Sequence, residues 1–85
     1  MVNAPTDFDH KVMFTIQQLA DSAYGPEIAQ TLEQSAGKSV SRGALYAALD
    51  RLERRGLVRG RIEAATDERG GFPRRRFEMT EAGAR

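Results

Sequence analysis

The hydrophobic pattern of this chain changes its period once, at Gly56, and this change restricts the possible folds more than any other feature. Before Gly56, apolar residues recur every three or four positions, which is typical of helices that bury one face. After Gly56, apolar and polar residues alternate, which is typical of strands. The pattern therefore predicts helices followed by strands. A chain of 85 residues suffices for one hydrophobic core, so we expect a single domain over residues 1–85.

The first expected helix covers about residues 8–22, with Thr6 or Asp7 as its N-cap. Phe14 lies about 200° around this helix from Val12, at about 100° per residue. We therefore expect Phe14 on the surface, and contact with a partner, such as a second copy of the chain, explains such an aromatic better than simple exposure. The core-facing stripe has spacings of three and four: Phe8, Val12, Ile16, Leu19 and Ala23.

Gly25 followed by Pro26 marks the start of a second helix, with Pro26 at its first helical position. Gly37 is expected to end this helix. Free backbone N–H groups near its start suit a phosphate, and the Tyr24 hydroxyl could join such a contact. Packing of Tyr24 at the turn explains the same residue equally well. The predicted inner face of this helix consists of Ile28, Leu32 and Ser35.

A third helix is predicted from Arg42 to Arg55, with Ser41 as its N-cap and Leu45, Leu49 and Leu52 facing the core. Its outward side combines small and polar residues, which allow the helix backbone to approach another surface closely. A helix of this kind fits the major groove of DNA. A plain amphipathic helix with solvated arginines explains the pattern equally well. The outward residues are Gly43, Ala47, Asp50 and Arg54, flanked by Tyr46 and Arg51, with an Asp50–Arg54 ion pair expected.

Two strands are expected after the helices, at residues 57–63 and 74–79, joined by a polar loop. Phe77 and Met79 turn inwards in the second strand, and residues 80–83 begin a fourth helix. This order is that of a winged helix-turn-helix. The predicted fold class is therefore mainly α with a small β-hairpin (α+β), consisting of three helices and a two-stranded wing.

Charge is divided unevenly along the chain. Residues 1–41 hold two lysines against five acids, whereas residues 42–85 hold eleven arginines against seven acids. A basic half suggests a polyanionic partner, although a solvated charged surface is an alternative. Arginine favours the first explanation, because its planar fork suits phosphates and guanine edges. Five arginines of the hairpin exceed what protection of a sheet edge requires: Arg59, Arg61, Arg74, Arg75 and Arg76, with Arg69 at the tip beside Gly70.

The composition also argues against several kinds of site. The chain has no cysteine and one histidine, His10, so neither a metal site nor a catalytic triad is expected. Glu33 and Glu53 are interpreted as ordinary solvated helix residues. We expect no cofactor and no enzymatic activity. The N-terminal residues do not resemble a signal peptide, and the longest apolar run is too short to span a membrane, so a cytoplasmic location is expected.

Several segments resemble the PadR family of bacterial transcriptional regulators. They are residues 23–28 (AYGPEI), 40–46 (VSRGALY), 49–58 (LDRLERRGLV), Gly70-Gly71, the basic run 74–76 and residues 79–83 (MTEAG). The resemblance implies the winged-helix DNA-binding domain of a repressor that is usually dimeric and is sometimes released from DNA by a small-molecule effector. It places Ser41, Gly43 and Tyr46 at the recognition surface and Arg74 and Arg75 in the wing.

Members of this family generally continue into a helical C-terminal segment that builds the dimer, and that segment is absent from these 85 residues. We therefore expect a DNA-binding domain alone, with Phe14 as the candidate dimer contact. The predicted function is sequence-specific binding of duplex DNA, and the alternative is a protein-interaction module with the same fold. The predicted DNA-binding residues are Tyr24, Lys38, Ser41, Arg42, Gly43, Tyr46, Arg51, Arg54, Arg69, Gly70, Arg74 and Arg75.

Overall fold

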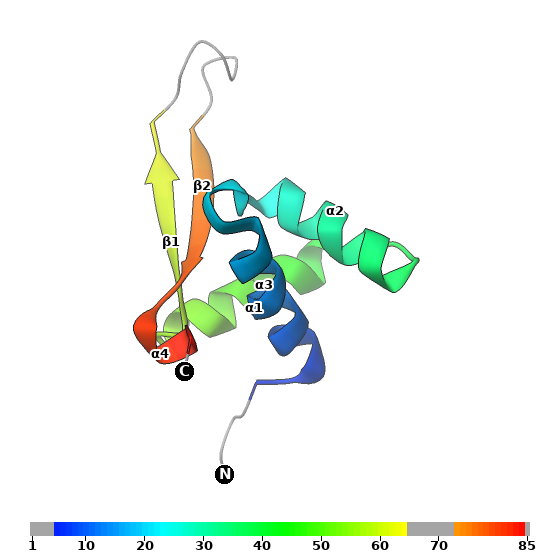
Figure 1. Ribbon diagram of the computed structural model, residues 1–85, viewed down its shortest axis with the longest axis horizontal. Helices are drawn as coiled ribbons and strands as arrows, with labels where there is room; N and C mark the ends of the chain where they lie inside the picture. Colours follow the sequence, from blue (N-terminus) through cyan, green and yellow to red (C-terminus); the bar gives the residue numbers. More distant parts are fainter. Residues whose placement is uncertain (1–4, 65–72, 85) are drawn as a thin grey trace.

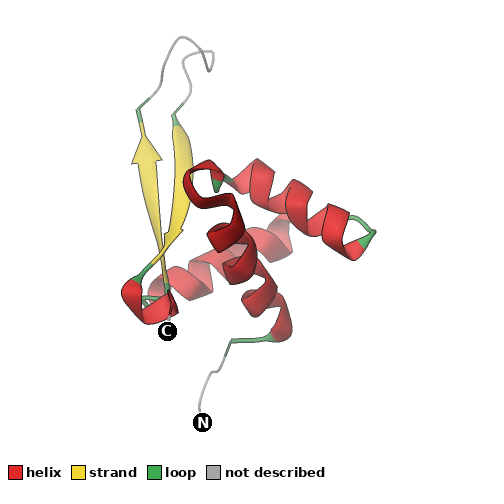
Figure 2. Ribbon diagram, viewed as in Figure 1, coloured by secondary structure: helices red, strands yellow, loops and turns green. Residues whose placement is uncertain are grey.

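The computed structural model describes residues 5–64 and 73–84. Figure 1 shows a β-hairpin standing beside a group of helices, from which α2 extends away, and Figure 2 shows the same division between helices and strands. The elements in chain order are α1 (Asp7–Leu19), the 3-10 turn η1 (Ala20–Ser22), α2 (Gly25–Ala36), α3 (Arg42–Arg54), β1 (Val58–Glu63), β2 (Arg74–Met79) and α4 (Glu81–Ala84).

Thr6 is the N-cap of α1 and forms a capping box with Asp9. The Thr6 hydroxyl accepts a hydrogen bond from the backbone N–H of Asp9, and the Asp9 carboxylate accepts one from the backbone N–H of Thr6, both at 3.1 Å. Each bond satisfies a donor that the first helical turn leaves free. Helix α1 then buries Val12 and Ile16, as the spacing predicted.

Helix α2 begins one residue earlier than predicted, so Gly25 is its first residue and Pro26 its second. Gly37 ends it in the left-handed conformation, with φ of 70°. The prediction that Ser35 faces the core is wrong, because Ser35 is exposed. Helix α2 packs through its first two turns, and Figure 1 shows its C-terminal end projecting beyond the other helices. Ser35, in the third turn, lines an open cavity between α1 and α2.

Strands β1 and β2 pair in antiparallel register, with Gly60 opposite Phe77 and Val58 opposite Met79. Phe77 is fully buried, and its backbone N–H donates to the carbonyl of Ala23 at 2.8 Å. The base of the hairpin is therefore fixed to the segment between α1 and α2.

One cluster of apolar side chains joins all three long helices to the hairpin. This arrangement is the predicted winged-helix α+β fold. None of the helices in residues 5–64 and 73–84 has the length and apolar character that crossing a membrane requires. The fully or almost fully buried members of the cluster are Val12, Ile16, Ala23, Ile28, Ala29, Leu45, Ala48, Leu49, Leu52, Val58 and Phe77.

Candidate nucleic-acid interface

The N-terminal half of α3 has an outward face with small side chains at its centre. Ser41 caps the helix, because its hydroxyl accepts a hydrogen bond from the backbone N–H of Ala44 at 3.2 Å. Gly43 and Ala47 are exposed, and a Cβ added at Gly43 would meet only the Ser41 hydroxyl, at 3.6 Å. Arg42 is exposed beside them and forms no ion pair within the described part of the chain. This face can approach a large flat or grooved surface closely, with a cation at its edge.

Tyr46 joins this face to the start of α2. Its side chain is 43% exposed, and its hydroxyl occupies the space that a Cβ at Gly25 would fill. A side chain at position 25 would therefore have to displace the Tyr46 ring, so packing favours glycine there. Sequence reasoning missed this role, because glycine before proline already had a sufficient local explanation.

Tyr24 lies between α2 and the wing, and its hydroxyl forms a hydrogen bond within the fold. Its hydroxyl donates to Glu63 of β1 at 2.7 Å, and the Arg74 guanidinium lies 3.6 Å from the centre of its ring. Arg74 also donates to Glu27 in the first turn of α2, at 3.0 Å. The structure thus shows Tyr24 packed at the turn, where it links α2 to both strands.

Arg51 and Arg54 form ion pairs of different kinds. Arg54 pairs with Asp50 at 3.0 Å along the exposed side of α3, as expected from their spacing. Arg51 instead reaches α1 and donates to Asp9 at 2.7 Å. The Asp9 carboxyl is 1% exposed, whereas the Arg51 side chain is 44% exposed. Burial raises the pKa of Asp9, but hydrogen bonds from Arg51 and Thr6 outweigh it, so that this pKa lies below its ordinary value.

The arginines of the wing are balanced by carboxylates. Arg59 and Arg61 share Glu78, at 3.4 and 2.6 Å, on one face of the hairpin. Arg76 pairs with Glu63 at 3.0 Å, and this hydrogen bond raises the Arg76 pKa. Much of the positive charge that the sequence places in the wing is therefore neutralised within the fold. Arg69 and Gly70, predicted at its tip, lie outside the described residues.

Two glutamates interpreted as solvated helix residues have structural contacts, so that interpretation is wrong. Glu33 accepts a hydrogen bond from the backbone N–H of Val40 at 2.9 Å and fixes the link before α3. Glu53 contacts both strands of the wing. The spacing of residues within one helix could not predict these hydrogen bonds, because each glutamate accepts from a donor outside its own helix.

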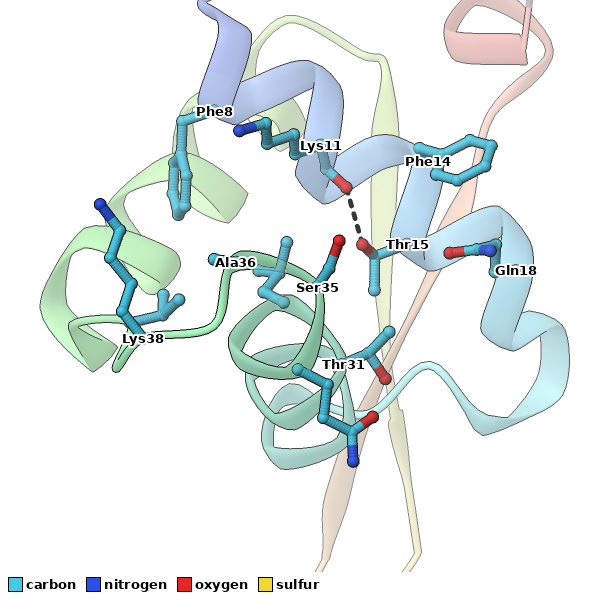
Figure 3. A pocket seen from close by; sticks show the side chains of 12 residues that line it. Phe8, Lys11, Phe14, Thr15, Gln18, Thr31, Ser35, Ala36 and Lys38 are labelled. Carbon is cyan, nitrogen blue, oxygen red and sulfur yellow. Dashed lines mark hydrogen bonds between the residues drawn. The ribbon is translucent and has the colours of Figure 1, made fainter.

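A cavity of about 610 Å³ opens between α1 and α2, on another part of the molecule. Phe14, 60% exposed, lies at one side of it and Phe8 at the other, as Figure 3 shows. Lys11 and Lys38 also line this cavity, and neither forms an ion pair within the described residues. The structure thus places Lys38 at the cavity, whereas the sequence grouped it with the DNA-binding residues.

The described residues contain no group of three acidic or histidine side chains that could hold a metal ion. A helix-turn-helix with an exposed third helix and a packed, arginine-bearing hairpin defines the winged-helix class of proteins. Residues 15–85 match the transcriptional regulator PadR-like family. The chain therefore belongs to this family, whose members are transcription regulators rather than enzymes.

Solved structures support this assignment. A chain of the hsRosR-S4 complex has 28% identity and a TM-score of 0.74, with 96% of this chain and 64% of that chain covered. A PadR-like transcriptional regulator from Bacillus cereus has 25% identity, a TM-score of 0.72, and 91% and 70% coverage. A PadR family regulator from Eggerthella lenta has 29% identity, a TM-score of 0.65, and 86% and 61% coverage. The chain thus spans roughly two thirds of these proteins. No curated protein matches it.

Proposed function

We propose that this PadR-like regulator binds duplex DNA sequence-specifically and acts as a repressor, with α3 in the major groove and the wing on the flanking backbone. The observation that carries this proposal is the exposed face of α3, where Gly43 and Ala47 allow close approach and Arg42 has no ion pair among the described residues. The major groove is wide enough to admit such a helix. A protein of this kind would act in the cytoplasm of a bacterium.

In this proposal, base edges are read from the outward face of α3 by Arg42, Tyr46, Arg51 and Arg54. Arg42, which is exposed at the start of the helix, also contacts a phosphate. Arg51 can do so while paired, because its bond to Asp9 uses one terminal nitrogen and the guanidinium has five donors. Arg54 is 78% exposed and can exchange Asp50 for a phosphate or a base. The carboxylate partners then limit non-specific attraction, since a phosphate must compete with them for each arginine.

The test is a titration of mixed-sequence duplex DNA followed by fluorescence anisotropy, at low and at moderate salt. The proposal expects binding that weakens steeply with salt, because phosphate contacts release counterions. A sequence-selection experiment then identifies the preferred site, which should be bound at least about a thousandfold more tightly than mixed DNA. A folded sample that does not bind at low salt would contradict the proposal.

We also propose that two copies associate through the face around Phe14, which would separate half-sites on DNA by about 34 Å. The support is an aromatic ring 60% exposed at the edge of a cavity. The change Phe14→Ser should shift a dimer to monomer in sedimentation experiments. Ile62→Ser is the matched control, since Ile62 is 77% exposed on the wing. A dimer that Phe14→Ser leaves intact would contradict this assignment.

The small-molecule effector that the family resemblance implies would, in our proposal, enter the same cavity. Its volume of about 610 Å³ lies within the usual range of small-molecule sites. The change Ala36→Phe would partly fill it, because Ala36 lines the cavity and is exposed. Loss of the response to an effector in this variant, with DNA binding retained, is the expected result. An unchanged response would place the effector elsewhere.

A second candidate function is a protein-interaction module. The described arginines of the wing are all ion-paired, which leaves less free charge for phosphates than the sequence suggests. The anisotropy titration separates the two functions, because a module of this kind would show no salt-dependent affinity for DNA.

A further inference from the structure

The side chain of Glu53 joins α3 to both strands of the wing. One carboxylate oxygen accepts a hydrogen bond from the backbone N–H of Gly60 in β1, at 3.2 Å. The other forms an ion pair with the Arg75 guanidinium of β2. Within the described residues, Glu53 is the side chain of α3 that hydrogen-bonds to the hairpin. The last turn of the helix is thereby attached to the wing at two points.

Arg75 is held on the same side of the hairpin by its surroundings. Its guanidinium lies 4.8 Å from the centre of the Phe77 ring, and Phe77 is fully buried. A Cβ at Gly60 would lie 2.7 Å from Arg75 Nε, so the arginine passes directly over the glycine. The absence of a side chain at Gly60 thus opens the path along which Arg75 reaches Glu53.

The other ion pairs that β2 makes with the helical part lead to elements before α3. Arg74 reaches Glu27 of α2, and Arg76 reaches Asp21 of η1. These pairs fix the hairpin to η1 and α2, and Val58 and Phe77 anchor its base in the core shared with α3. Among the described residues, the side-chain hydrogen bonds between α3 and the strands all come from Glu53. A two-stranded hairpin has little independent stability, so its direction depends on such attachments.

We propose that Glu53 is a positioning residue that sets the angle between the wing and α3, through Arg75 and the Gly60 N–H. This inference rests on the proposed DNA-binding function, because a fixed angle lets α3 and the wing meet one duplex together. It assigns Arg75 to the positioning of the wing instead of the phosphate contact that the sequence suggested.

The test is the double variant Glu53→Gln with Arg75→Gln, which removes the ion pair and keeps the net charge. A change in DNA affinity is then not due to the overall charge, and the distance measurement below separates the angle of the wing from loss of a direct Arg75 contact with DNA. The glutamine at position 53 retains an acceptor for the Gly60 N–H. The matched control is Glu78→Gln with Arg61→Gln, which removes a 2.6 Å ion pair from the same hairpin without touching α3. Thermal unfolding verifies that each protein is folded. The single variant Glu53→Gln is measured in the same way.

Two readouts separate positioning from binding. The chain has no cysteine, so cysteines placed at Ala47 on α3 and Ile62 on β1 carry spin labels at these two exposed sites alone. The distance distribution between the labels, measured without DNA, should broaden in the Glu53/Arg75 variant and stay narrow in the control. Anisotropy on unlabelled protein should show DNA affinity reduced about tenfold, as expected if the docked wing is populated one tenth of the time.

An unchanged distance distribution in the Glu53/Arg75 variant would overturn the proposal. So would a broadened distribution with unchanged affinity in a chain that binds DNA, because the angle would then not matter for binding. If the unaltered chain binds no DNA, the proposed function fails, and the distance measurement still decides whether Glu53 fixes the wing.

Discussion

The change Asp9→Asn should destabilise the fold by an amount that depends on pH. Asp9 is 1% exposed and accepts hydrogen bonds from Arg51 at 2.7 Å and from the backbone of Thr6 at 3.1 Å. Hydrogen bonds to a charged group contribute about 1.5–3 kcal/mol each. Asparagine can accept only one of the two, and the half-exposed Arg51 regains water. We therefore expect a loss of about 2 kcal/mol, and a Tm lower by roughly 8–16 °C for a domain of this size.

The sign of the pH dependence follows from the lowered pKa of Asp9. The Asp9 carboxylate binds a proton less readily in the folded chain than in the unfolded chain. Its stabilising effect is therefore complete above the ordinary carboxyl pKa of about 4. The effect is lost as the pH falls through the lower pKa that Asp9 has in the folded chain. Thermal unfolding of both proteins between pH 7 and pH 2 measures this directly. The difference in Tm should shrink below pH 4.

Asp7→Asn is the matched control, because Asp7 is an exposed acid in the same helical turn. It should cost only about 0.5 kcal/mol through the helix dipole. An Asp9→Asn variant that loses no more stability than Asp7→Asn would refute the reasoning. A Tm difference that persists unchanged to pH 2 would refute the contribution of the charge.

Three further substitutions test other parts of the account. Gly25→Ala should displace the exposed end of the Tyr46 side chain at a cost of up to about 1 kcal/mol in urea unfolding, since the ring can move towards solvent. A Tyr46 fluorescence spectrum identical to that of the unaltered chain would contradict the contact. Gly43→Ala, its control on α3, should leave stability unchanged or raise it by up to about 1 kcal/mol, yet weaken DNA binding in anisotropy titrations. Phe77→Ala should cost about 3–5 kcal/mol in the same unfolding assay, because Phe77 is fully buried at the base of the wing, and a loss below 1 kcal/mol would contradict its place in the core.

The helices, their caps and the core could be predicted from the sequence because these features are local. Thr6 and Ser41 satisfy free donors within their own helical turns, and the apolar spacing identifies the buried face of each helix. Ser35 was assigned wrongly because periodicity indicates which side of a helix is apolar, but not where the neighbouring elements end. That limit belongs to any argument from a single helix.

The electrostatic part of the candidate site could not be predicted in the same way. Arg51 meets Asp9 across 42 positions of the chain, and Arg74 meets Glu27 across 47. Counting charges in each half of the sequence suggested a free positive wing, whereas folding brings acids from both halves against the arginines of the second half. Asp9, Asp21 and Glu27 come from the first half, and Glu53, Glu63 and Glu78 come from the second. Only the arrangement of α1, α2 and the hairpin in space shows which cations keep their charge available.

The central claim is that the outward face of α3 contacts DNA, and the salt dependence of binding tests it most directly. The slope of log affinity against log salt should be steep for the unaltered chain and should fall by about one unit for Arg42→Ala. Lys11, on α1 at the cavity, is another cation that forms no ion pair among the described residues. Lys11→Ala should leave the salt slope unchanged. Equal slopes for Arg42→Ala and the unaltered chain, or a loss confined to Lys11→Ala, would contradict the account.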